Sequence, residues 1–344
     1  MSIGIQTANG KAFEYACVIG LFNALKSTGA VQIESSPQLE TAKNLYDKAA
    51  SDMKDALDKA ADAAVRVIKR LEPQLWNPNN NEPLYLSIQP DSAGIKGDVR
   101  DILCLRKQNG WEIGFSCKHN HHAVKHSRLS DTIDFGKEWI DSPCSSQYFN
   151  TVVPLFSELR KCRDDSKSAG KPMLWDEIEY KADRYYKPVL NAFMDELKRI
   201  ADYEKDTPEK LIRYLIGRND FYKVITDDKN RTTRVEAINI SGTLNCTSGT
   251  EKPIAKVPIL KMPTRFYHIG FKPESDNTIV VVCDEGWQIS MRIHNASSRV
   301  EPSLKFDVQL ISFPSSVYAQ VKPWETAEEK LVRRAAAYTK RIKE

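Results

Sequence analysis

The first 70 residues carry apolar side chains at the spacing of α-helices. In residues 11–26 they recur every four positions, as on one buried helix face, at Phe13, Cys17, Leu21 and Leu25. Residues 39–71 repeat this pattern, with aspartates towards the opposite side, and predict one or two amphipathic helices that end before Pro73. The Asn- and Pro-rich residues 73–83 are predicted to form a loop.

Beyond this loop the apolar period changes to two residues, which indicates strands. Alternation predicts three consecutive strands at residues 84–88, 101–106 and 111–117. The polar, His-rich segment after Lys118 is predicted to be helical, as are residues 147–161, 175–203, 209–216 and 325–342. Further strands are predicted at residues 221–225, 234–240, 278–283, 287–294 and 304–313.

This order of elements predicts the fold class. Helices, a strand meander, more helices and a β-rich tail are typical of an α/β protein with a mixed α+β sheet, rather than of a doubly wound one. The chain has 344 residues, 41% of them hydrophobic, which is enough for one large domain or two ordinary ones. If there are two, the boundary is predicted near Ile225, between a core of residues 1–225 with inserted helices and a β-rich part of residues 226–344 with a C-terminal helix.

Composition and charge narrow the class of protein. The longest apolar runs, such as residues 278–283, are far shorter than the roughly 20 residues of a membrane-spanning helix, and the N-terminus lacks the order of a signal peptide. Seven cysteines without a CxxC pair argue against a disulfide framework and a thiolate zinc site. We therefore expect a cytoplasmic protein without a membrane partner. The net charge of +4 is too small to identify a nucleic-acid binder, so any DNA contact must come from local clusters.

The dipeptide Asn109-Gly110, between two alternating segments, predicts a β-hairpin with a two-residue type I′ turn. In that register Asp101 faces Lys118, and directly opposed side chains share one face of the sheet. We therefore expect Asp101 and Lys118 to meet, with Ser116 beside them. A plain cross-strand salt bridge is the alternative to a functional pair.

The sequence around this pair resembles the PD-(D/E)xK nuclease superfamily, in which an Asp opens one strand and an acid-x-Lys closes the next. The spacing of 17 residues from Asp101 to Lys118 is ordinary for that superfamily. More closely, four segments resemble the HaeIII family of type II restriction endonucleases: GDVRDILCL, EIGFSCKHNHHAVKHSRLS, DFGKEW and GWQISMRIHNASSRVEPSLKFDVQL.

The resemblance implies a restriction-endonuclease-like core and a bacterial or phage-defence enzyme. Such an enzyme binds double-stranded DNA, requires Mg²⁺ and cuts a short palindrome; for this family the site is GGCC, cut in the middle to leave blunt ends. A palindromic target implies a homodimer, or a monomer that nicks each strand in turn. A companion DNA methyltransferase acting on the same site is also expected, and the β-rich C-terminal part is expected to recognise the DNA.

Ser116 departs from the superfamily pattern, because it stands where an acid is expected two residues before Lys118. A hydroxyl is a poor Mg²⁺ ligand, so a second acid must come from elsewhere. Glu112 lies about 13 Å further along the strand and is rejected. Glu14, near the buried face of the first helix, is the first choice, and Asp131 is the second. Asp134 and Glu138 are further acids of the same segment as Asp131.

The expected chemistry is in-line hydrolysis at a Mg²⁺ site. Asp101, the second acid and the backbone carbonyl of Cys117 are expected to bind the metal, which polarises the phosphate and activates water. Lys118 is expected to orient that water and to stabilise the charge that builds up on phosphorus. Asp98 is the alternative to Asp101 as the metal-binding acid. Because side chains alternate between the two faces of a strand and Asp98 is three residues from Asp101, Asp98 is expected on the opposite face unless a β-bulge intervenes.

Two polar clusters are candidate DNA contacts. The first follows the hairpin and consists of His119, Asn120, His121, His122, Lys125, His126 and Arg128. Its histidine spacing also fits a helical His-metal site, and a solvated polar helix is the neutral interpretation. The second consists of Arg292, His294, Asn295, Ser298, Arg299 and Lys305. It is the candidate for sequence readout, since Arg binds guanine O6 and N7 together, and an exposed polar loop is its alternative.

Other functions remain open at this stage. A repair or junction-resolving nuclease has the same core, and the His cluster leaves room for a His-metal nuclease. The third alternative is a non-catalytic DNA-binding protein, in which the replacement of the usual acid by Ser116 has abolished cleavage.

Overall fold

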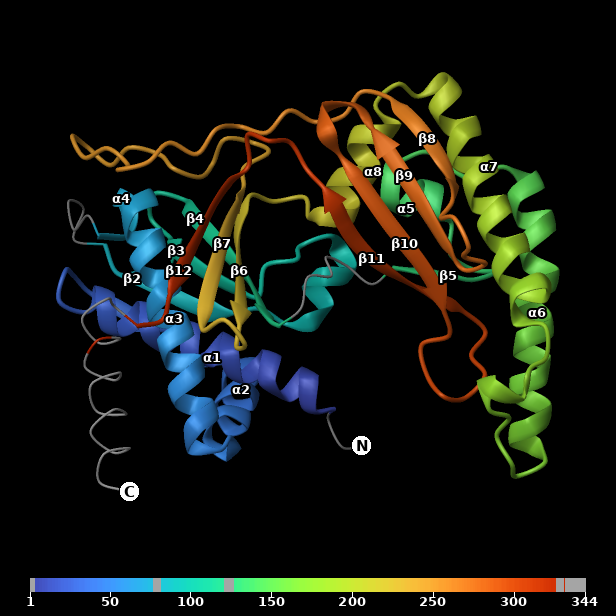
Figure 1. Cartoon of the computed structure of the whole chain (residues 1–344), viewed down its shortest axis with the longest axis horizontal. Coiled ribbons are helices and arrows are strands. Elements are labelled where there is room, and N and C mark those ends of the chain that lie inside the picture. Colours follow the sequence, from blue (N-terminus) through green and yellow to red (C-terminus); the bar gives the residue numbers. More distant parts are fainter. Residues whose placement is uncertain (1–3, 77–81, 121–126, 326–330, 332–344) are drawn as a thin grey trace. The chain divides into compact units, whose positions relative to one another are not determined.

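The computed structural model describes residues 4–76, 82–120, 127–325 and 331 (Figure 1). The chain forms two compact units, each made of discontinuous segments. Unit 1 comprises Met1–His121, Asn219–Leu260 and Ser316–Glu344, and unit 2 comprises His122–Arg218 and Lys261–Ser315. The boundary predicted near Ile225 falls inside a strand, Phe221–Asp227, which pairs with the strand Thr232–Ile238 in one sheet of unit 1.

Unit 1 is built on a mixed sheet with the strand order β1-β2-β3-β4-β6-β7-β12. The strands are β1 (Val31–Ile33), β2 (Leu84–Ile88), β3 (Ile102–Arg106), β4 (Trp111–His119), β6 (Phe221–Asp227), β7 (Thr232–Ile238) and β12 (Tyr318–Pro323). The helices are α1 (Ile5–Leu25), α2 (Pro37–Lys48), α3 (Ser51–Leu71) and α4 (Pro73–Trp76), with a 3₁₀ turn at Asp91–Lys96. The pairs β1/β2 and β4/β6 are parallel, and the other neighbours are antiparallel.

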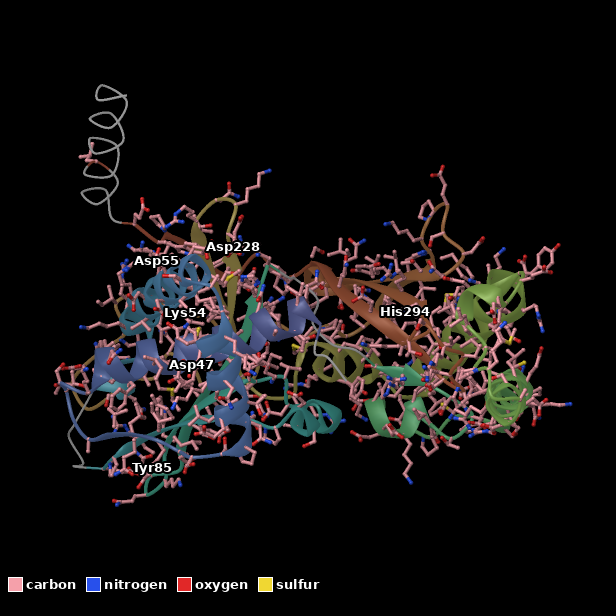
Figure 2. The ribbon with its side chains drawn as sticks, turned by 90° about the horizontal axis from the view of Figure 1, so that it is seen from below. Asp47, Lys54, Asp55, Tyr85, Asp228 and His294 are labelled. Carbon is pink, nitrogen blue, oxygen red and sulfur yellow. The ribbon has the colours of Figure 1, made fainter. Side chains whose placement is uncertain are left out.

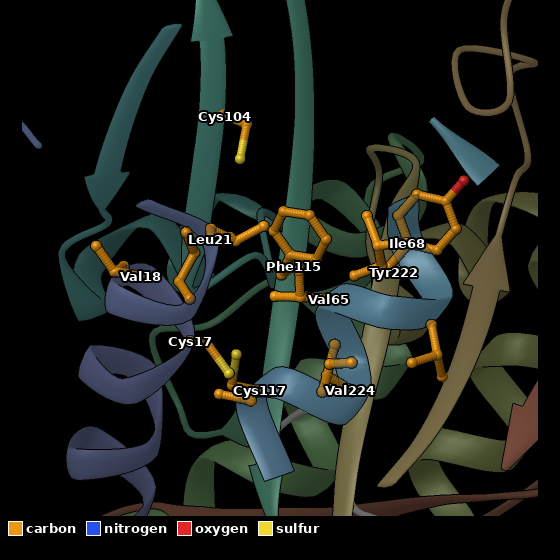
Figure 3. Close-up of a cluster of buried hydrophobic side chains, with 14 of the residues drawn as sticks. Cys17, Val18, Leu21, Val65, Ile68, Cys104, Phe115, Cys117, Tyr222 and Val224 are labelled. Atoms are coloured by element: carbon orange, nitrogen blue, oxygen red, sulfur yellow. The ribbon is translucent and has the colours of Figure 1, made fainter. Parts of the chain in front are cut away.

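The core of unit 1 lies between this sheet and the helices α1 and α3. Cys17, Val18 and Leu21 from α1 and Val65 and Ile68 from α3 pack on the strands (Figure 3). The strands supply alternate residues to this core, among them Cys104, Phe115, Cys117, Tyr222 and Val224. Because successive side chains of a strand point to opposite faces, the residues between them point to the other face of the sheet.

Unit 2 is built on an antiparallel sheet with the strand order β5-β11-β10-β9-β8. The strands are β5 (Arg128–Leu129), β8 (Phe266–Phe271), β9 (Thr278–Cys283), β10 (Gln288–His294) and β11 (Leu304–Ser312). The helices are α5 (Phe135–Ile140), α6 (Ser146–Ser168), α7 (Lys187–Tyr203) and α8 (Thr207–Ile216). Short turns lie at Trp175–Glu177 and Asp284–Gly286 (3₁₀) and at Ala182–Tyr186 (π).

Helices cover one face of the sheet in unit 2. The ring of Phe306 on β11 contacts Trp139 of α5 and Phe193 of α7, with ring centroids 6.2 and 5.3 Å apart. The alternate positions of β10 and β11 carry polar side chains, including Arg292, His294 and Lys305. A sheet with one apolar and one polar face is typical of antiparallel strands.

The predicted fold class, a mixed sheet with flanking helices, is confirmed at this level. Several short strands, β1, β5, β8 and β12, were not predicted. The loop predicted for residues 73–83 begins with the helical turn α4. The prediction of a helix after Lys118 is wrong for the described residues, because β4 continues to His119 and β5 begins at Arg128. Of the final predicted helix, all but residues 325 and 331 lie outside the described residues.

The hairpin register differs from the prediction by two residues. Arg106 pairs with Trp111, so the connection comprises residues 107–110 instead of a two-residue turn. A type I′ turn needs positive φ at both central residues, but only Gly110 has it, at 66°. Asn109 instead accepts a hydrogen bond from the backbone N–H of Trp111 at 2.9 Å. A shift of two residues leaves each side chain on its predicted face, because the side-chain period is two.

None of the helices in the described part of the chain has the length and apolar character needed to cross a membrane.

Candidate active site

Three donors converge on the carboxylate of Asp101, immediately before β3. Its Oδ2 accepts hydrogen bonds from the backbone N–H of Cys117 at 2.7 Å, from Lys118 Nζ at 3.2 Å and from Ser116 Oγ at 3.4 Å. The backbone N–H of Asp101 donates to the carbonyl of Phe115 at 2.7 Å, which holds the residue against β4. The predicted contact between Asp101 and Lys118 is confirmed, although the register is not.

Lys118 is a charged group held in place by a carboxylate. Burial alone lowers the pKa of a lysine, but the negative charge of Asp101 and the hydrogen bond to it outweigh burial and raise the pKa of Lys118 above its ordinary value. Lys118 is therefore an ammonium at neutral pH. Its side chain is 23% exposed.

Glu14 lies on α1 and is only 5% exposed. Its Oε2 accepts a hydrogen bond from Lys11 Nζ at 3.1 Å. Burial, and next the negative charge of Asp101, raise the pKa of Glu14 to about 8, whereas the charges of Lys11 and Lys118 oppose that rise. The charge of Asp101 therefore reaches Glu14, which places Glu14 in the same cluster as Asp101.

A contact between two free cysteines positions α1 over this cluster. The side chain of Cys17 lies against that of Cys117 (Figure 3), and the interaction with Cys17 is the main cause that raises the pKa of Cys117. Cys17 follows Glu14 by three residues, so both face the same side of the helix. The apolar face of α1 thus orients Glu14 towards the end of β4.

Asp98, the rival of Asp101, belongs to a separate ion-pair network. Arg100 contacts Asp98 Oδ1 through Nε and Oδ2 through Nη2, each at 2.8 Å, and contacts Glu112 through Nη1 at 2.7 Å. Burial raises the pKa of Asp98. The hydrogen bonds from Arg100 and its positive charge lower this pKa by more, so the net shift is downward. Gly114 leaves the space that Arg100 fills, since a Cβ there would lie 2.1 Å from Arg100 Cδ.

The oxygen donors near Asp101 suit a hard divalent cation. Mg²⁺ prefers carboxylate oxygen, and a bound cation would offset both causes that raise the pKa of Glu14, its burial and next the negative charge of Asp101. In unit 2, Asp131 is instead held by Arg160, whose Nη2 lies 2.6 and 2.5 Å from its two oxygens. Asp134 caps α5 through the backbone N–H of Lys137 at 2.9 Å. Over the described residues, no group of three or more His, Cys, Asp or Glu is arranged to hold a metal.

The described part of the His-rich segment is held by Asp228, which follows β6 (Figure 2). His119 Nε2 lies 3.0 Å from Asp228 Oδ2. Asn120 has a positive φ of 53°, donates to Asp228 Oδ2 at 2.8 Å and accepts from the backbone N–H of Asp228 at 3.0 Å. The other candidates of this segment, His121, His122, Lys125 and His126, lie outside the described residues.

Lys223 and Glu236 were missed by the sequence analysis. Lys223 on β6 pairs with Ser116 on β4, and Glu236 on β7 pairs with Lys223. Burial lowers the pKa of Lys223 to about 8; the negative charge of Glu236 opposes this lowering, and the positive charge of Lys118 adds to it. A signal was present, because Lys223 interrupts the apolar run of residues 221–225.

In unit 2, three basic residues form a row across neighbouring strands. His294 on β10, labelled in Figure 2, pairs with Lys305 on β11, which pairs with Arg128 on β5. Burial, and next the positive charge of Arg128, lower the pKa of Lys305, whereas Asp307 opposes that change. Arg292 lies on the same face of β10 and contacts Asp307 at 3.4 Å.

The loop after β10 is fixed by its own hydrogen bonds. The side-chain amide of Asn295 donates to the carbonyls of Ser297 and Arg299, each at 2.6 Å, and the residue is 8% exposed. The carbonyl of Ser298 accepts from the backbone N–H of Trp175 at 2.8 Å. The amide nitrogen of Asn295 is thus engaged within the loop, which weakens its case as a base-reading group.

Comparison with known proteins adds an independent finding. The model of the HaeIII restriction endonuclease family matches residues 10–314. The type II restriction enzyme HaeIII of Haemophilus aegyptius is 39% identical over 318 residues, which cover 92% of this chain and 98% of that enzyme. No solved structure matches the chain.

Proposed function

Because the chain belongs to the HaeIII restriction endonuclease family, and so is a type II restriction endonuclease that acts on double-stranded DNA, we propose that it cuts GGCC in the middle and leaves blunt ends. The relative HaeIII is a type II restriction enzyme by name, and the family resemblance implies this target. We place the cleavage centre at Asp101, Lys118 and Glu14.

The observation that supports this centre is the convergence of Lys118, Ser116 and the Cys117 N–H on one oxygen of Asp101. This is the arrangement expected of a PD-(D/E)xK core in which the acid before the lysine has become Ser116. We assign the second carboxylate to Glu14 on α1, which is buried, lies three residues before Cys17 at the contact with Cys117, and is acted on by the charge of Asp101. The second choice for this acid, Asp131, is paired with Arg160.

The residues that would hold Mg²⁺ are Asp101, Glu14 and the backbone carbonyl of Cys117. When bound, the cation supplies Lewis-acid polarisation of the phosphate and neutralises part of its charge. Lys118 is proposed to orient the attacking water and to stabilise the negative charge that develops on the phosphate oxygens. Asp101 keeps the ammonium of Lys118 in position through the 3.2 Å contact.

The polar sheet face of unit 2 is proposed as a DNA-contacting surface. Two cations at adjacent register positions, Lys305 and Arg128, repel each other, and a phosphate relieves that repulsion. We assign His294, Lys305 and Arg128 to phosphate contacts. Arg292, whose side chain is 55% exposed, is the candidate for guanine readout.

A palindromic target leads us to propose a homodimer on DNA. A restriction enzyme endangers the DNA of its own cell, so we also propose a companion methyltransferase that protects GGCC. Both proteins then act in the cytoplasm, where that DNA lies.

The proposal is tested by digesting plasmids that carry or lack GGCC, with Mg²⁺ or with EDTA, and sequencing the ends. We expect discrete fragments with blunt GG/CC ends, formed only with Mg²⁺ and only from the plasmid that carries the site. Discrete fragments with other ends would contradict the target sequence. Cleavage confined to branched DNA would support a junction-resolving nuclease instead.

A further inference from the structure

A second lysine, Lys223, shares the sheet face of Ser116 and Lys118. Cys117 and Phe115 on β4 and Val224 and Tyr222 on β6 point into the core. Successive side chains of a strand alternate between the two faces, so the residues next to these core positions point to the opposite face. They are Ser116, Lys118 and Lys223. Lys223 is 6% exposed, as is Glu236 beside it on β7.

The register places Lys223 next to the groups assigned to cleavage. Lys223 pairs with Ser116, whose hydroxyl lies 3.4 Å from Asp101. Lys118 pairs with Ile225, two residues after Lys223 and on the same face, so the two lysines are diagonal neighbours on adjacent strands. Diagonal neighbours are separated by about 7 to 8 Å, a distance that two long side chains can close.

The charge of Lys118 acts on Lys223 across this gap. The positive charge of Lys118 contributes to the lowered pKa of Lys223. Like charges this close are costly in a buried site, and an anion between them relieves the cost for both. The acid on the far side, Glu236, is also bound by Arg234 Nε at 2.6 Å.

We propose that Lys223 is a second cation of the cleavage centre, which contacts a DNA phosphate together with Lys118. This inference rests on the proposed function, because it assumes that DNA enters at Asp101 and Lys118. Glu236 lies beside Lys223 as a counter-charge and is a positioning residue. Lys223 thereby supplies a fixed positive charge on the β6 side of the site, where the superfamily motif has none.

The test uses the full-length protein with Lys223→Gln and Lys223→Arg. Lys59→Gln is the matched control, because Lys59 lies on α3 and is paired with Asp55 at 2.7 Å. Binding to a GGCC duplex is measured with Ca²⁺ at increasing salt concentrations, and single-turnover cleavage is measured with Mg²⁺.

Removing one phosphate contact lowers the slope of log affinity against log salt by about one. We expect this change, and a cleavage rate at least ~10-fold lower, for Lys223→Gln. Lys223→Arg should keep the wild-type slope and recover part of the rate, and Lys59→Gln should match the wild type in both. The fold should survive, because Glu236 keeps its contact with Arg234.

A Lys223→Gln protein with the wild-type salt slope would overturn the proposal, even if its cleavage were slower. A purely structural role of Lys223 would slow cleavage without changing the salt slope. If the Gln variant does not fold, Lys223→Met gives the same readouts. A wild-type protein that does not cut GGCC would contradict the proposed function alone, since the salt slope on any duplex still decides the role of Lys223.

Discussion

The ammonium of Lys118 lies 3.2 Å from Oδ2 of Asp101, and this contact joins the ends of two adjacent strands. It forms although the hairpin between them has a different turn from the one its sequence suggests. The contact therefore depends on the side-chain parity of the strands and not on the turn.

Lys118→Met should abolish cleavage while the fold survives. The loss removes the cation that stabilises the charge developing on phosphate, and loss of one such group typically costs about 10²- to 10³-fold in rate. Asp101 keeps its hydrogen bond from the Cys117 N–H at 2.7 Å. Single-turnover cleavage and thermal melting are the measurements. A variant that cuts within tenfold of the wild-type rate would remove Lys118 from the mechanism.

Glu14→Gln should lose Mg²⁺-dependent cleavage and gain stability at alkaline pH. Folding raises the pKa of Glu14 from 4.5 to about 8, so the folded state binds the extra proton and loses stability as pH rises between these values. The variant lacks this loss, and its melting temperature should exceed that of the wild type most at pH 8 and least near pH 4.5. An unchanged cleavage rate would exclude Glu14 as the second acid.

Glu72→Gln provides a matched case away from the cleavage centre. Glu72 is fully buried and accepts hydrogen bonds from Tyr222 Oη and from the backbone N–H of Asn245, each at 2.6 Å. Burial raises its pKa from 4.5 to about 7, while both hydrogen bonds oppose the rise. Stability gained by the variant should therefore appear between pH 4.5 and 7, on the order of 3 kcal/mol. Urea unfolding across this range tests it, and cleavage should be unaffected.

Gly114→Ala should destabilise unit 1. The new Cβ would lie 2.1, 2.7 and 2.9 Å from Cδ, Cγ and Cβ of Arg100, too close to the backbone for a simple side-chain rotation to relieve. Arg100 would leave Asp98 and Glu112, at a cost of about 1 to 3 kcal/mol. Urea unfolding measures the loss, and a stability within 0.5 kcal/mol of the wild type would show that Arg100 relaxes freely.

Lys305→Gln should weaken binding to every duplex to a similar extent. If Lys305 contacts a phosphate, its loss lowers the salt slope by about one and leaves base preference unchanged. Binding titrations on GGCC duplexes and on duplexes with one altered base pair make the comparison. Relaxed base preference would instead mean that Lys305 reads a base edge.

The sequence predicts the parts of this protein that depend on local periodicity. The helices α1 and α3 and the strands β2 to β4 follow from apolar spacing alone, and the side-chain contact between Asp101 and Lys118 follows from parity. The turn could not be predicted, because the N–H of Gln108 is bound by the Glu82 carboxylate, a residue 26 positions away.

The residues that sequence reasoning missed depend on contacts between distant segments. Lys223 reaches Ser116 only because β6 adds to β4 as a parallel neighbour, after a long connection through unit 2. Strand β1 has only three residues, too few for a clear period. Strand β12 buries no more than every second residue partly, so its apolar pattern is weak, and both strands are defined by their partners in the sheet. Glu14 could be proposed from its place on the helix, but its proximity to Asp101 depends on how α1 packs.

The most direct test of the cleavage centre compares Asp101→Asn with the wild type on one GGCC duplex. DNA binding is measured with Ca²⁺ and strand cleavage with Mg²⁺, under the same salt and pH. We expect the variant to bind the duplex with an affinity within a few-fold of the wild type and its cleavage to be undetectable. Cleavage by Asp101→Asn at the wild-type rate would place the centre elsewhere in the protein.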